Sequence, residues 1–154
     1  MIELFRRVLV PHDFSVRANG ALEVAVALAE EHRGRVRVLH ALSPSAVAHE
    51  VVWASRAKIR AGLREGLERE VAELLGKRAA RVECEVVIAE PIRAIVAAAR
   101  KADSIVMATL GETGLAHFLL GSTTEKVVRL SPVPVLTVHV KPKRRRPRTR
   151  ARSR

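Results

Sequence analysis

Short apolar runs alternate along this chain with longer segments in which apolar residues recur every three or four positions. The short runs predict β-strands, and the three- to four-residue spacing predicts amphipathic helices. Strands are expected at residues 7–10, 35–41, 82–88, 104–108 and 133–138. Helices are expected from Ala18 to a stop at Gly34, around residues 63–74, from Pro91 and from Ser122. This alternation predicts an α/β fold: a single doubly wound, parallel, five-stranded sheet with helices on both faces.

The strands differ in ways that predict their places in the sheet. Residues 104–108 are apolar without alternation, as expected for a central parallel strand that is covered on both faces. In residues 82–88 the apolar positions alternate with Glu83 and Glu85, which favours a place near a sheet edge. Pro134 has no N–H to donate to a neighbouring strand, so residues 133–138 are also predicted at an edge.

Two loops that follow predicted strands carry the candidate chemistry. In doubly wound sheets, ligands bind beyond the carboxyl ends of the strands, where the strand order reverses. Residues 12–15 and 109–121 are therefore predicted to flank a ligand crevice. The second loop is rich in glycine and ends in Gly121-Ser122, where a helix is expected to begin. The unpaired N–H groups and the dipole of a helix start favour an anion such as phosphate.

Ser122 also fits a purely structural role. Ser122 and Glu125 have the spacing of a capping box, in which a hydroxyl and a carboxylate bond to exposed backbone N–H groups at a helix start. A cap and a phosphate would compete for the same N–H groups, so both roles of Ser122 stay open.

The formal net charge of +12 changes the picture only at the C-terminal end. Residues 141–154 contain nine Lys or Arg and no acid, whereas the rest of the chain has 19 basic and 16 acidic residues. We expect a nearly neutral domain at residues 1–140 and a disordered basic tail at residues 141–154. The tail is predicted either to be a solvated extension or to contact nucleic acid or another polyanion without sequence preference.

Other composition features restrict the class of protein. Cys84 has no second cysteine to pair with and is expected to be a buried structural thiol. No run approaches the roughly 20 apolar residues that span a bilayer, and the N-terminus lacks a signal-peptide pattern, so a cytoplasmic location without a membrane partner is expected. The six histidines show no metal-ligand spacing, and no metal site is predicted.

Several motifs together resemble the universal stress protein family across residues 5–140. They are Val8-Leu9-Val10-Pro11 before Asp13-x-Ser15, His40-Ala41 after the second strand, Gly114-Leu115-Ala116-His117-Phe118-Leu119-Leu120-Gly121-Ser122-Thr123-x-Glu125, and the segment 132–138. The resemblance implies a Rossmann-like fold of the adenine-nucleotide alpha-hydrolase type, an adenine nucleotide such as ATP or AMP, Mg²⁺ where a triphosphate is bound, and a homodimer through the last strand. The binding residues that it implies are Pro11, Asp13, Ala41, Met107, Ala108, Gly111, Gly121, Ser122 and Thr123.

The glycine motif of the ATP-binding branch is incomplete here. Gly111, Gly121 and Ser122 match its second glycine, third glycine and hydroxyl residue, whereas Ala108 takes the place of its first glycine. The methyl group of Ala108, with Leu110 and Glu112 where polar or basic residues are common, is predicted to weaken phosphate binding. If this position needs a positive φ, alanine also adds strain.

Asp13 has two roles that stay open. The resemblance implies that its carboxylate bonds to the adenosine end of the nucleotide. The alternative is that Asp13 only begins the following turn or helix, as aspartate often does.

No residue pattern predicts catalysis. The sequence lacks a Walker A lysine, a G-x-S-x-G elbow and a cysteine–histidine signature, and the single Trp53 offers no platform for stacked bases. The prediction is a cytoplasmic sensor or regulator of the stress response that binds an adenine nucleotide, with at most very slow ATP hydrolysis. The alternatives are a nucleotide-free interaction protein with a degenerate pocket and an ATP pyrophosphatase or synthetase, against which the missing catalytic loops argue.

Overall fold

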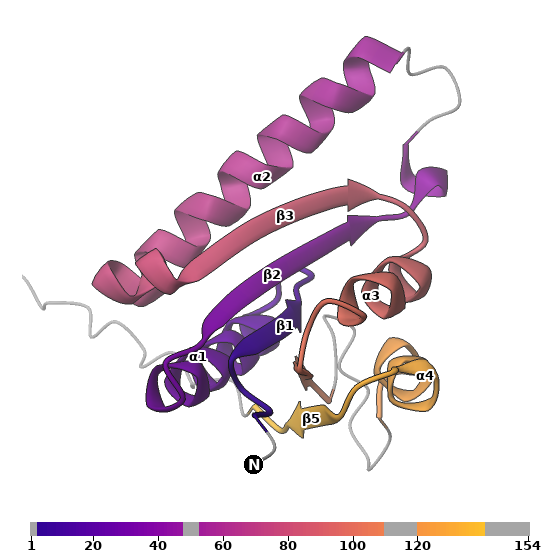
Figure 1. Ribbon diagram of the computed structural model, residues 1–154. Helices are drawn as coiled ribbons and strands as arrows, with labels where there is room; N and C mark the ends of the chain where they lie inside the picture. Colours follow the sequence, from indigo (N-terminus) through magenta and orange to yellow (C-terminus); the bar gives the residue numbers. More distant parts are fainter. Residues whose placement is uncertain (1–2, 48–52, 110–119, 141–154) are drawn as a thin grey trace, which may run out of the picture.

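The computed structural model describes residues 3–47, 53–109 and 120–140. Within them, five strands pair in parallel in the order β3-β2-β1-β4-β5 (Figure 1). The strand order reverses between β1 and β4, which confirms the doubly wound α/β fold, and the predicted edge strands lie at the two edges. The strands are β1 (Arg7–Pro11), β2 (Arg35–Leu42), β3 (Val82–Ile88), β4 (Ser104–Ala108) and β5 (Val135–Val138).

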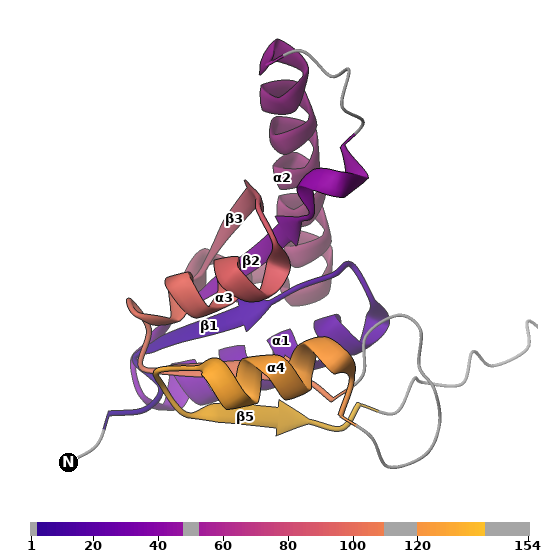
Figure 2. The same cartoon turned by 90° about the vertical axis from the view of Figure 1, so that its right-hand side faces the viewer.

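Helices cover both faces of the sheet, as the alternating pattern predicts (Figure 2). α1 (Val16–Glu31) and α2 (Trp53–Leu75) pack against one face. α3 (Pro91–Ala99) and α4 (Ser122–Leu130) pack against the other. Cys84 is buried in the core under α1 and α2, and this burial raises the pKa of its thiol to about 11. Among the described helices, none is long and apolar enough to cross a membrane.

The turn from α1 into β2 differs from the sequence prediction. α1 ends at Glu31, and the left-handed backbone falls on Arg33, with φ 53°, and not on Gly34. Gly34 is needed for another reason, because a Cβ at this position would collide with the backbone of Phe5 and Arg6. The short segment before β1 is therefore in direct contact with the turn before β2.

The C-terminal strand is shorter than predicted. β5 begins at Val135, two residues after the expected start, because Pro134 cannot donate a ladder hydrogen bond. Beyond β5, the side chain of Val140 packs so closely on α1 that a Cβ at Gly20 would displace it. The predicted basic tail, residues 141–154, lies outside the described residues.

Candidate functional site

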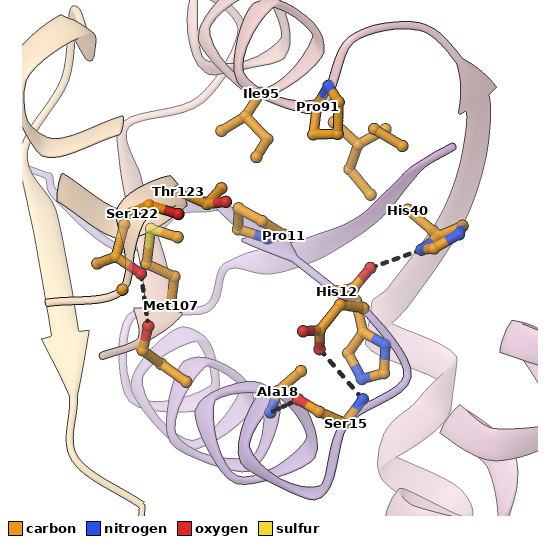
Figure 3. Close-up of a pocket in the computed structure, with 16 residues that line it drawn as sticks. Pro11, His12, Ser15, Ala18, His40, Pro91, Ile95, Met107, Ser122 and Thr123 are labelled. Carbon is orange, nitrogen blue, oxygen red and sulfur yellow. Dashed lines mark hydrogen bonds between the residues drawn. The ribbon is translucent and has the colours of Figure 1, made fainter. Parts of the chain in front are cut away.

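A pocket of about 360 Å³ opens at the carboxyl ends of β1, β2 and β4 (Figure 3). It lies at the point where strand order reverses, where doubly wound sheets bind ligands. Of the nine binding residues implied by the sequence, Gly111 lies outside the described part of the chain. The other eight all line the pocket: Pro11, Asp13, Ala41, Met107, Ala108, Gly121, Ser122 and Thr123.

The loop after β1 holds Asp13 at the pocket through short hydrogen bonds. One carboxylate oxygen of Asp13, Oδ1, accepts the N–H of Ser15 at 3.1 Å, and the Ser15 hydroxyl accepts the N–H of Ala18 at 3.1 Å to cap α1. The other oxygen, Oδ2, has no hydrogen-bond partner among the described residues. Asp13 is exposed, so this oxygen is open to a ligand. The turn role of Asp13 thus occupies only half of its carboxylate.

A buried histidine underlies this loop. His12 Nδ1 accepts the N–H of Phe14 at 3.2 Å, so the ring proton is on Nε2, which lies 2.8 Å from Asn19 Oδ1. Asn19 in turn donates to Glu70 of α2 at 2.6 Å. Burial lowers the pKa of His12, which keeps the ring neutral at physiological pH. This chain of contacts fixes the left-handed backbone of Phe14, with φ 63°.

The sequence analysis missed this network. Its members come from three segments of the chain, and only the fold brings His12, Asn19 and Glu70 together. The available signal was weak: Asn19 is a polar residue beside the buried Ala18 in the first turn of α1.

His40 joins the end of β2 to the same loop. Its Nδ1–H donates to the carbonyl of His12 at 2.8 Å (Figure 3). Its ring lies 4.7 Å from that of Phe14. The N–H of His12 also donates to the carbonyl of Leu39 at 2.9 Å. The loop is therefore held from β2 on one side and from α1 on the other.

The predicted capping box at α4 is wrong. Gly121, not Ser122, occupies the N-cap position, no side chain caps the helix, and the Glu125 carboxylate lies 3.7 Å from Arg129 instead. The cause is a 2.6 Å hydrogen bond from the N–H of Gly121 to the carbonyl of Thr109, which fixes where the helix begins. The N–H groups of residues 122–124 consequently have no acceptor within the described residues, and all three residues line the pocket.

Ala108 ends β4 without a positive φ, so the strain considered for an alanine at this position does not arise. Its carbonyl accepts the hydroxyl of Thr124 at 3.0 Å, which links the strand to α4. The expected weakening of phosphate contacts stays a prediction, and Leu110 and Glu112 lie outside the described residues.

The pocket has little negative charge. Asp13 supplies the one carboxylate among the lining side chains that the structure describes. Within the described ranges, no group of three or more His, Cys, Asp or Glu side chains is placed to hold a metal ion. From the described lining, an anionic ligand would therefore meet a single like charge, at Asp13.

Comparisons with known proteins agree over nearly the whole chain. The model of the universal stress protein family matches residues 4–139. The Thermus aquaticus protein named "Universal stress protein in QAH/OAS sulfhydrylase 3′region" is 33% identical over 146 residues, covering 88% of this chain and 99% of its own.

Two solved structures extend the comparison. UspA from Lactobacillus plantarum has a TM-score of 0.72 at 22% identity, covers 88% of this chain and 98% of its own, and so shares the fold. A universal stress protein in complex with cAMP has a TM-score of 0.65 at 26% identity and covers 89% of this chain and 98% of its own.

Proposed function

The chain belongs to the universal stress protein family, and from this premise we propose that it binds an adenine nucleotide in the pocket at the carboxyl ends of β1, β2 and β4. The observation that carries the proposal is that residues from three strand ends and the start of α4, all implied by the sequence motifs, line one pocket. The relative solved with cAMP supports an adenine nucleotide as the ligand. We further propose that the protein is a cytoplasmic sensor or regulator of the stress response.

The order of the strands suggests how the nucleotide lies. At the end of β2, Leu39 and Ala41 with Ile95 of α3 give an apolar wall suited to the base. Asp13, at the end of the neighbouring β1, has a free carboxylate oxygen for a ribose hydroxyl. Beyond β4, the N–H groups of residues 122–124, which have no acceptor among the residues that the structure describes, and the dipole of α4 suit the phosphates.

We propose that nucleotide turnover is very slow. Both ring nitrogens of His12 are already hydrogen-bonded, and among the described residues no hydroxyl or thiol is hydrogen-bonded to Nε2 of His40, so neither histidine forms a nucleophile–base pair there. Mg²⁺ would accompany a triphosphate and be held mainly by the phosphates, since Asp13 is the one carboxylate in the described lining. A steady-state phosphate-release assay tests this, and sustained turnover would contradict it.

Calorimetric titration with ATP, ADP and AMP tests the binding itself. We expect saturable binding that Asp13→Ala weakens about tenfold to a hundredfold, because a hydrogen bond to a charged group is lost. Glu73→Ala, which removes an exposed carboxylate from α2, is the matched control and should leave the affinity unchanged. No binding at millimolar nucleotide would contradict the proposal and favour the nucleotide-free interaction protein.

We also propose a homodimer through β5. This strand lies at the sheet edge, and Leu136 on it is 39% exposed. Pairing with a second copy would cover the strand edge and the side chain of Leu136. Light scattering should show a dimer that Leu136→Lys disrupts and that Val16→Lys, at an exposed residue of α1, does not. A wild-type monomer at tens of micromolar would defeat the proposal.

For the basic tail we propose contact with polyanions. Nine cations in residues 141–154 would displace counterions from nucleic acid, so binding should fall steeply with salt. DNA and RNA binding by the full chain should exceed that of a chain ending at Val140. Equal binding by the two chains would contradict the proposal.

A further inference from the structure

A second pocket, of about 260 Å³, lies at the opposite end of the sheet, where β1, β2 and β3 begin. Its charged lining side chains lie near the starts of these strands, in the turn before β3 and at Lys101, the second residue after α3. Five are cationic and one is acidic: Arg7, Arg35, Arg37, Arg81, Lys101 and Glu83. The pocket thus has a surplus of positive charge from segments that are far apart in the sequence.

Two of the cations already have carboxylate partners. Arg7 lies 2.6 Å from Asp103, and Arg37 lies 3.7 Å from Glu85. Arg37 also donates to the carbonyl of Ala98 at 2.7 Å, near the C-terminal end of α3. These contacts hold the two guanidinium groups in place, and the carboxylates offset their positive charge, so the two groups contribute little to binding an anion.

The other three cations are not neutralised. In the described parts of the chain, no carboxylate lies within ion-pair distance of Arg35, Arg81 or Lys101. All three are exposed, so the cost of keeping them charged is small. Arg81 is held at the pocket by a hydrogen bond of 3.4 Å to the carbonyl of Gly34. Against these three charges stand the carboxylate of Glu83 and that of Glu30, which interacts with Arg81 from beyond ion-pair distance.

We propose that this pocket binds a compact anion that contains two or more linked phosphates, separately from the nucleotide pocket. Cations that converge on one concavity suit a small, multiply charged anion, and guanidinium groups pair well with phosphate oxygens. A long nucleic-acid strand would instead need cations spread along an extended surface. Because the free cations are exposed, binding is weakened by salt.

Titration of the full, ¹⁵N-labelled chain with inorganic tripolyphosphate tests the proposal. The amide signals of Arg35, Arg81 and Lys101 should shift saturably, and orthophosphate should bind more weakly at the same positions. The double variant Arg35→Gln, Lys101→Gln should weaken tripolyphosphate binding about three- to tenfold, as expected for two exposed charge contacts.

The matched control is Arg69→Gln with Lys126→Gln, which removes two exposed cations from α2 and α4. It should leave the affinity of the pocket unchanged, and equal weakening by both double variants would overturn the proposal. Shifts confined to residues 141–154 or to the loop around Asp13 would also overturn it. The proposal would also be overturned if an RNA oligonucleotide shifts the amide signals of Arg35, Arg81 and Lys101 and tripolyphosphate does not. Adenosine should shift amide signals of the nucleotide pocket, around Asp13, Ala41 and Ile95, and leave those of Arg35, Arg81 and Lys101 unchanged, so the two pockets are tested independently.

Discussion

The two ends of one parallel sheet carry opposite chemistry in this protein. At the carboxyl end, helix α4 begins with N–H groups that have no acceptor in the described parts of the chain, and the described pocket lining holds one acidic and no lysine or arginine side chain. At the amino end, where helices finish and strands begin, cations gather around a second pocket. Every strand points the same way, so helix starts collect at one end and helix finishes at the other. Helix dipoles then favour a bound anion at the first end, whereas at the second they favour the protein's own arginine and lysine side chains, on which the proposed anion site depends.

The two ends also differ in how they are held. The amino end is closed by main-chain packing of Gly34 against Phe5 and Arg6, and by the contact of Arg7 with Asp103. The carboxyl end depends on side-chain hydrogen bonds around His12. Stability should therefore respond more strongly to changes at the amino end, and ligand binding to changes at the carboxyl end.

The largest effect is expected for Gly34→Ala. Its Cβ would collide with backbone atoms, which cannot move as a flexible side chain can, so we expect a loss of about 2–4 kcal/mol in the free energy of unfolding. Urea denaturation measures this. Gly62→Ala, in open space on α2, is the control and should stabilise by about 0.5–1 kcal/mol. If both substitutions stabilise, the close packing inferred at the amino end is wrong.

A smaller effect is expected for Asp103→Asn. Asp103 accepts the N–H of Arg7 at 2.8 Å and its guanidinium at 2.6 Å, and these contacts lower the pKa of the carboxyl. The variant should lose about 1–2 kcal/mol in the free energy of unfolding at pH 7.

Acid should remove this difference. The contribution of a carboxyl with a lowered pKa is present above its usual value and disappears as the pH falls through the folded-state pKa, so the two proteins should begin to converge as the pH falls below about 4. Glu3→Gln, which breaks an exposed pair with Arg6, should cost less than about 0.5 kcal/mol. A pH-independent difference for Asp103→Asn would contradict the assigned cause.

The smallest effect concerns His12 at the carboxyl end. Its lowered pKa means that the unfolded chain binds protons more readily, so stability falls as the pH drops below about 6.5. Between pH 7 and pH 6 the loss from this group should stay below about 0.7 kcal/mol. His12→Gln should remove this component, measured by urea denaturation at both pH values, whereas the exposed His32→Gln should retain it. An unchanged pH response in His12→Gln would argue against a buried neutral ring.

The sequence predicts the fold well because its signals are local. Alternation in β3, the proline before β5 and the uninterrupted apolar run of β4 each follow from neighbouring residues, and each places its strand correctly. The position of Asp13 at the pocket follows from a rule of the same kind, since carboxyl ends of parallel strands share an edge, whereas Pro11 and Ala41 were implied by the resemblance to the family.

The errors and omissions come from contacts between distant residues. The start of α4 depends on a hydrogen bond between Gly121 and Thr109, and no local pattern reveals it. The cationic pocket was missed because the net charge of residues 1–140 is small. Composition gives the sum of the charges, but only the strand arrangement separates Arg35 and Lys101 from Asp13.

The central position of β1 has a consequence for synthesis on the ribosome. β1 is made first, and one of its edges can pair with β2 soon afterwards, Val8 beside Val36. Its other edge waits for β4, where Val8 lies beside Ser104, so most of the chain must be translated before the middle of the sheet closes. Until then the nascent chain exposes an unpaired apolar strand, which is an edge that can pair with other chains. The first strand to emerge is therefore the one that most needs shielding during translation.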